Sequence, residues 1–152
     1  MFKLSDVIER HHVVPGLDAR DKASLLEELA RRAAVALKVN EGKIKAALHA
    51  REHLGSTGVG NGVAIPHARI EGLKQPFGMF ARIEPAIAFG AIDNAPVDLV
   101  FLLLTPAQGN AGHLAVLAAI SRRLRDPITA AAIRAAANGG EIFDRLTANP
   151  GK

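Results

Sequence analysis

The eight residues VDLVFLLL, at positions 97–104, constrain the fold more than any other stretch of this chain. Their longest unbroken apolar part, Leu99 to Leu104, is far shorter than the ~20 residues of a membrane-spanning helix. A strand with apolar side chains on both of its sides is typical of the centre of a sheet that is covered on both faces. The run therefore predicts a buried central strand.

Helical and strand-like patterns surround this central strand. Helices are predicted at residues 21–39, 40–51, 110–124, 128–137 and 140–147. Further strands are predicted at residues 62–65, 77–83 and 86–89. Because strands in the middle of the chain have helices before and after them, we predict an α/β sandwich whose sheet is covered by helices on both faces.

Size and composition limit the domain organisation and the chemistry. A chain of 152 residues with 49% hydrophobic residues is long enough for one core and too short for two, so we expect a single domain over residues 1–152. The N-terminus lacks the residue order of a secretory signal, and we expect a soluble, cytoplasmic protein without membrane insertion. The absence of cysteine excludes disulfides, thiolate catalysis and cysteine-based metal sites. Histidine is then the expected nucleophile.

The positive charge raises the alternative of a nucleic-acid-binding module. The net charge is +4 and the isoelectric point is about 9.9. However, aromatic residues make up 4% of the chain and all are phenylalanine, so few rings are available to stack on bases. The densest basic run, at residues 122–125, lies in a predicted helix and is expected to form a solvated face. We therefore expect no nucleic-acid partner.

The stretch GSTGVGNGVAIPH, residues 55–67, concentrates glycine ahead of one histidine. Gly55 and Gly60 have the spacing of a phosphate-binding P-loop, but Asn61 stands where that motif needs lysine. A dinucleotide fingerprint needs a third glycine after two that are one residue apart, and Val63 occupies that place. Both motifs are therefore excluded.

The same stretch can still bind an anion. Glycine amides can turn inward as an anion-binding nest, to which Ser56 and Thr57 would add hydroxyl donors. The predicted phosphate-binding loop consists of Ser56, Thr57, Gly58, Gly60 and Gly62. Because Pro66 has no amide hydrogen, we expect the strand to end there and to leave His67 at the carboxyl edge of the sheet, where ligands bind. The residues alone leave an alternative open, in which the glycines form a tight turn and His67 is a surface or packing residue.

Two further residues stay unassigned on the residues alone. Arg51 lies beside Glu52 near the end of a predicted helix and close to the glycine-rich loop, and such an arginine is usually solvated. His113 lies in the first turn of the helix that we expect Asn110 to cap, in line with Leu117. A histidine in that position commonly lies at the end of the helix side that faces the core.

Four segments in this order resemble one protein family. They are RE at 51–52, LGSTGVGNGVAIPHAR at 54–69, AIDNAPVDLVFLLLTPA at 91–107 and HLAVLAAISRRLRD at 113–126. They resemble the type 2 enzyme IIA domain of the bacterial phosphoenolpyruvate phosphotransferase system, the fructose and mannitol kind, and within it the nitrogen-regulatory enzyme IIA. The resemblance spans about Leu4 to Thr147.

The resemblance implies a mixed sheet and a phosphoryl carrier without a cofactor. It implies that His67 accepts a phosphoryl group from an HPr-like carrier protein and holds it as phosphohistidine, with Arg51 and His113 beside it. It also implies a regulatory role in a nitrogen-related phosphotransferase system, with targets such as transporters or sensor kinases. The alternative is the IIA component of a fructose or mannitol uptake system.

A histidine-based metal site is a remote alternative. It could be built from His67 and His113 with His53 or His49, but no pair has the tight helical spacing of a metal motif. The adjacent pair at residues 11–12 would point to opposite faces of a strand. We therefore predict no metal site.

Overall fold

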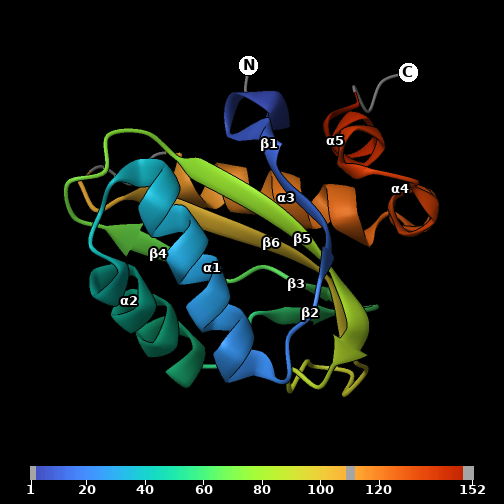
Figure 1. Ribbon diagram of the computed structural model, residues 1–152, viewed down its shortest axis with the longest axis horizontal. Coiled ribbons are helices and arrows are strands. Elements are labelled where there is room, and N and C mark those ends of the chain that lie inside the picture. Colours follow the sequence, from blue (N-terminus) through green and yellow to red (C-terminus); the bar gives the residue numbers. More distant parts are fainter. Residues whose placement is uncertain (1–2, 109–111, 149–152) are drawn as a thin grey trace.

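One mixed sheet forms the centre of the molecule, and residues 3–108 and 112–148 of this computed structural model are described here. Its six strands are β1 (Ile8–Leu17), β2 (Gly58–Gly60), β3 (Val63–Ala64), β4 (His67–Ile70), β5 (Phe77–Ile87) and β6 (Val97–Pro106). The sheet order is β1-β5-β6-β3-β2, and β4 also pairs with β6 (Figure 1). β5 and β6 are antiparallel, whereas β1 runs parallel to β5, and both β3 and β4 run parallel to β6.

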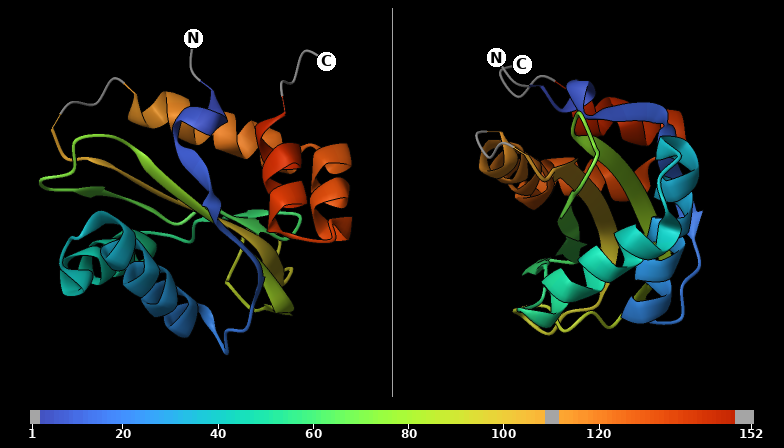
Figure 2. Two further views of the ribbon diagram at one scale, coloured as in Figure 1. Left: turned by 45° about the horizontal axis from the view of Figure 1, so that its top comes forward. Right: turned by 90° about the vertical axis from the view of Figure 1, so that its left-hand side faces the viewer.

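Helices cover both faces of the sheet, which confirms the predicted sandwich. One face carries α1 (Lys22–Leu37) and α2 (Glu41–His53). The other face carries α3 (His113–Arg125), α4 (Pro127–Ala135) and α5 (Gly139–Thr147) (Figure 2). A short 3-10 helix, Leu4–Asp6, precedes β1. In the described part of the chain, no helix combines the length and the hydrophobicity that a membrane crossing needs.

The predicted central strand is β6, and its side chains serve two cores in alternation. Val100, Leu102 and Leu104 pack with the buried residues of α1 and α2. Leu99, Phe101 and Leu103 pack with those of α3, α4 and α5. Each of these six side chains is fully buried. Successive side chains of a strand point to opposite faces, so the continuous apolar run has a direct physical cause in the two helical layers.

Side-chain caps fix where four of the helices begin. Asp21 accepts a hydrogen bond from the Ser24 amide at the start of α1, and Asn40 accepts one from Lys43 at the start of α2. Asp126 and Asn138 cap α4 and α5 in the same way. α3 starts at His113 with no side-chain cap, and the expected cap Asn110 lies outside the described residues.

The strand predictions need correction in three respects. No strand was predicted for β1, β2 or β4, and the predicted strands at 77–83 and 86–89 are covered largely by one strand, β5. β1 has an irregular register against β5 and contains Pro15 and Gly16, so it lacks the clean alternation that sequence analysis detects. β3 ends at Ala64, before Pro66, as predicted, but pairing with β6 resumes in β4 at His67, so the expected position of His67 at the carboxyl edge of the sheet is wrong.

Candidate functional site

His67 lies where one edge of β6 changes partner from β3 to β4. It is the first residue of β4 and stands opposite Leu103 in the parallel register. The proline before it has no amide hydrogen, but the Pro66 carbonyl accepts a hydrogen bond from the Leu103 amide at 2.9 Å. His67 is therefore held at a break within the sheet instead of at its carboxyl edge.

Both ring nitrogens of His67 have partners. Nδ1 lies 2.8 Å from the Ile65 carbonyl oxygen, and Nε2 lies 3.2 Å from Nε of Arg51. A carbonyl oxygen only accepts and a guanidinium only donates, so in the neutral ring Nδ1 carries the hydrogen and Nε2 carries the lone pair. The hydrogen-bonding partners thus assign the tautomer.

The surroundings of His67 favour this neutral ring. Burial is the main cause that lowers the pKa of His67 below its ordinary value of 6.5, and the Arg51 charge lowers it further. The bond to Ile65 and the carboxylate of Glu52 act in the opposite direction without reversing the shift. At neutral pH the ring therefore presents an unprotonated Nε2.

Arg51 approaches His67 from the last turn of α2. Its Nη1 donates to the Gly55 carbonyl at 2.9 Å, which fixes the guanidinium while Nε points at the imidazole. The neighbouring Glu52 turns inward instead, where its side chain is 7% exposed and pairs with Lys22 at 2.7 Å. Arg51 is thus a half-buried neighbour of His67, and it does not form the weak solvated pair expected of its sequence context.

His113 comes to the same site from the start of α3. Its ring centroid lies 5.7 Å from that of His67, with the ring planes 54° apart. Its Nδ1 lies 2.6 Å from Oγ1 of Thr105, which follows the apolar run of β6. Burial, followed by the charges of Arg69 and His67, lowers the pKa of His113, so this ring is also neutral at pH 7.

Thr105 and Arg69 are site residues that sequence analysis missed. They stand opposite each other in the parallel register of β4 and β6. Arg69 lies two residues after His67 in β4, so its side chain leaves the same face of the strand. The two-residue spacing of His67 and Arg69 indicates a shared face only in a strand, and no strand was predicted at β4.

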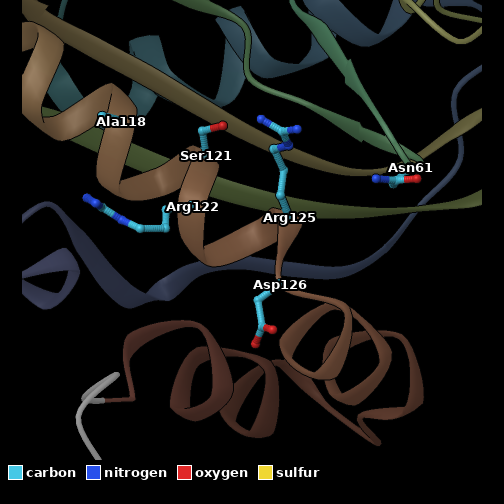
Figure 3. Close-up of a pocket in the computed structure, with 6 residues that line it drawn as sticks. All are labelled: Asn61, Ala118, Ser121, Arg122, Arg125 and Asp126. Carbon is cyan, nitrogen blue, oxygen red and sulfur yellow. The ribbon is translucent and has the colours of Figure 1, made fainter.

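An open pocket of about 370 Å³ lies beside His67. It is lined by Arg51, Ser56, Thr57, Val59, Ile65, His67, Leu114, Leu117, Ala118 and Ser121. Leu114, on the first turn of α3, is 72% exposed at its rim. Ala118 and Ser121 also line a neighbouring pocket farther along α3, together with Asn61, Arg122, Arg125 and Asp126 (Figure 3).

Two residues of the predicted phosphate-binding loop lie in the His67 pocket, but their polar groups have partners within the protein. The Ser56 hydroxyl donates to the Phe89 carbonyl at 3.3 Å and accepts from the Gly58 amide at 3.0 Å. Thr57 is buried, and both its amide and its hydroxyl donate to the Glu52 carboxylate. Phosphate binding by Ser56 and Thr57 stays a prediction.

The remaining glycines of the loop belong to a hairpin outside the lining of that pocket. Gly58 and Gly60 form β2, and Asn61 and Gly62 make the turn into β3 with φ of 58° and 80°. Positive φ at both central residues is the signature of the type I′ turn that joins paired strands. The tight turn that the sequence left open is therefore present here, and the anion role of these glycines stays a prediction.

Comparison with known proteins identifies the family. Residues 6–149 match the family described as the phosphoenolpyruvate-dependent sugar phosphotransferase system, EIIA 2. This chain belongs to that EIIA 2 family. The family membership confirms the resemblance and implies phosphotransfer carrier activity.

Nitrogen regulatory proteins are among the relatives of this EIIA domain. It is 42% identical to one from Bradyrhizobium diazoefficiens, over 97% of this chain and 96% of the relative. It is 37% identical to one from Escherichia coli, over 99% and 93% of the two chains. The crystal structure of nitrogen regulatory protein IIA-Ntr from Neisseria meningitidis superimposes with a TM-score of 0.90 at 32% identity, covering 95% of this chain and 99% of that one. The mixed sheet with helices on both faces is thus the IIA-Ntr fold.

Proposed function

We propose that the EIIA domain accepts a phosphoryl group on Nε2 of His67 from the phosphohistidine of an HPr-like carrier. The observation that carries this proposal is the pairing of Nδ1 with the Ile65 carbonyl, which leaves Nε2 as the nitrogen with the lone pair. Nε2 attacks phosphorus, the bond from phosphorus to the carrier nitrogen breaks, and its electron pair returns to the carrier ring. Throughout the step the hydrogen stays on Nδ1, which donates it to the Ile65 carbonyl.

Arg51 and His113 take complementary roles around the transferred group. Phosphoryl transfer requires charge stabilisation at the equatorial oxygens and alignment of donor and acceptor. During transfer the guanidinium of Arg51 gives up its 3.2 Å hydrogen bond to Nε2 and donates to a phosphoryl oxygen instead. When the Thr105 hydroxyl donates to Nδ1 of His113, the hydrogen of that neutral ring lies on Nε2 and is available to a second oxygen.

The pocket beside His67 is suited to a visiting protein. Leu114 and Leu117 supply apolar contact area next to the reactive ring, and Leu54 is 83% exposed just after α2. An open, partly apolar site lets a carrier protein reach the imidazole and then leave. We propose that residues 1–152 act as one cytoplasmic EIIA unit whose partner is an HPr-like phosphocarrier.

A regulatory role in a nitrogen-related phosphotransferase system fits this chain better than sugar uptake. The support is the naming of its relatives at 37–42% identity over nearly the full chain as nitrogen regulatory proteins. Phosphorylation adds about 1.5–2 negative charges by analogy with other phosphorylated side chains, which is enough to change the docking of a charged target. Transporters and sensor kinases remain the predicted classes of target.

The test is phosphorylation of the purified chain by phosphoenolpyruvate, the first enzyme of the phosphotransferase system and an HPr-like carrier. Intact mass should show one acid-labile phosphoryl group, and nitrogen NMR of the imidazoles should place it on Nε2 of His67. H67A should lose the label, whereas H53A, an exposed histidine at the end of α2, should retain it. A labelled H67A protein would refute the proposal.

A further inference from the structure

A second group of histidines lies on β1, which β5 and β6 separate from the strand that carries His67. His11 and His12 follow Glu9 and Arg10 in the first half of β1, and their ring centroids are 4.1 Å apart. The phosphotransfer chemistry proposed above uses none of these residues.

An irregular bulge brings the two rings together. Ile8 of β1 pairs with Gly78 of β5, but the next pair is Val13 with Phe80. Five residues along β1 are thus matched by two along β5, so the strand between them cannot keep its alternation of side chains. The prediction that adjacent histidines in a strand point to opposite faces is therefore wrong for His11 and His12.

We propose that Glu9, His11 and His12 form a binding site for a divalent transition-metal ion, with Zn²⁺ as the test ion. One ligand atom from each residue can be chosen so that all three lie within 4.8 Å of one another. The carboxylate oxygen of Glu9 and Nε2 of His11 are 3.4 Å apart. That separation matches the ~3.4 Å edge of a tetrahedron whose ligands lie about 2.1 Å from zinc.

The chemistry of the three ligands selects the kind of ion. Two imidazoles and one carboxylate suit zinc, copper or nickel, whereas calcium and magnesium prefer sites made of oxygen alone. Three protein ligands leave a fourth tetrahedral position for water. The carboxylate also supplies a negative charge to the ion.

The neighbouring side chains leave the proposed site open to a cation and hold one of its ligands in place. The guanidinium of Arg10 is drawn away toward α5, where it pairs with Asp144 at 2.9 Å and lies over the Phe143 ring. The ring of His12 packs edge-on against Phe77, with centroids 5.0 Å apart.

The experiment is a calorimetric titration of the chelator-treated full chain with zinc chloride at neutral pH, followed by proton NMR of the imidazoles. Wild type should bind one ion per chain, and the resonances of His11 and His12 should move. H11A and H12A should each weaken binding at least about 10-fold, the loss that even an indirect partner of a ligand causes. E9Q should also weaken zinc binding.

The matched controls separate this site from the phosphoryl site. Glu9 and His11 have side chains that are 69% and 71% exposed, so E9Q and H11A leave the core intact. H67A and H53A should bind zinc as wild type does. Binding that survives in both H11A and H12A, or that disappears in H67A, would overturn the proposed site while leaving the phosphohistidine proposal untouched. Failure of phosphorylation alone would leave the zinc result standing.

Discussion

At the scale of single residues, the two ring nitrogens of His67 have different partners, so one carries the hydrogen and the other the lone pair. The Ile65 carbonyl fixes the tautomer and Arg51 faces the lone pair. The guanidinium has a second anchor on Gly55, so its position does not depend on the presence of a phosphoryl group. In the proposed transfer, this geometry makes the charge of Arg51 available without a large rearrangement.

Replacing Arg51 should slow transfer without unfolding the protein. For R51Q we expect a rate of phosphoryl transfer from the carrier about 10- to 100-fold lower, because a hydrogen bond from a charged donor contributes about 1.5–3 kcal/mol. Rapid-quench single-turnover kinetics measure this rate, and circular dichroism checks the fold. R145Q, at an exposed arginine on α5, is the matched control. An unchanged rate in R51Q would exclude the assigned role.

The lowered histidine pKa values predict a pH dependence of stability. Burial lowers the pKa of His12, His67 and His113 below 6.5 in the folded chain. The unfolded chain then takes up protons first, so the free energy of unfolding should be unaffected by these groups above about pH 6.5 and should fall as the pH drops below it. Urea unfolding between pH 8 and pH 5 measures the trend. H67A should show a shallower decline, and an equal slope would contradict the shift assigned to His67.

At the scale of elements, the hairpin of β2 and β3 lies within the glycine-rich stretch and pairs with β6 through β3. Its turn depends on Gly62, where φ is 80° and a Cβ atom would come within 2.5 Å of Arg134 Nη2. Arg134 also donates to the Asn61 carbonyl and to both oxygens of Asp98. The glycine therefore serves the packing of α4 against the hairpin as well as the turn itself.

A pair of glycine variants can separate these two roles. G62A should destabilise the protein by more than the ~1–2 kcal/mol expected for a left-handed residue with a side chain, because the new methyl group also meets Arg134 and Asp98. G72A is the control, since Gly72 has φ of 87° and no atom within 4 Å of an added Cβ. Urea unfolding compares the two variants. Equal losses of stability would show that the contact with Arg134 is unimportant.

At the scale of the whole molecule, one strand is shared by two cores. The side chains of β6 alternate between the α1 and α2 layer and the layer of α3, α4 and α5. Neither helical layer has a sheet of its own. The stabilities of the two layers are therefore coupled through β6.

This coupling predicts a single unfolding transition for variants on either side of the sheet. L102A opens a cavity against α1 and α2, and L103A opens one against the other layer. Each should cost about 2–5 kcal/mol of unfolding free energy. Far-UV circular dichroism during urea unfolding should show one cooperative transition for both variants. Two separated transitions in either variant would contradict a shared core strand.

The same molecule shows which features a sequence can predict. The apolar run of β6 and the helical periods depend on local patterns, and both were found correctly. The bulge in β1 erased the alternation around His11, so that strand was missed. Arg69 and Thr105 meet through a parallel register that no local pattern records. The family resemblance placed Arg51 and His113 beside His67, whereas spacing alone had left each of them unassigned.

The hydrogen bond between Nδ1 of His67 and the Ile65 carbonyl limits the side from which Nε2 can be reached. The imidazole cannot flip without breaking that hydrogen bond, so under the phosphohistidine proposal the phosphoryl group reaches and leaves Nε2 from the same side, past Arg51. A donor protein and an acceptor protein cannot both occupy that side of the ring at the same time. Under the phosphohistidine proposal, the chain therefore meets its phosphoryl donor and its acceptor one after the other and does not bridge the two proteins at this ring.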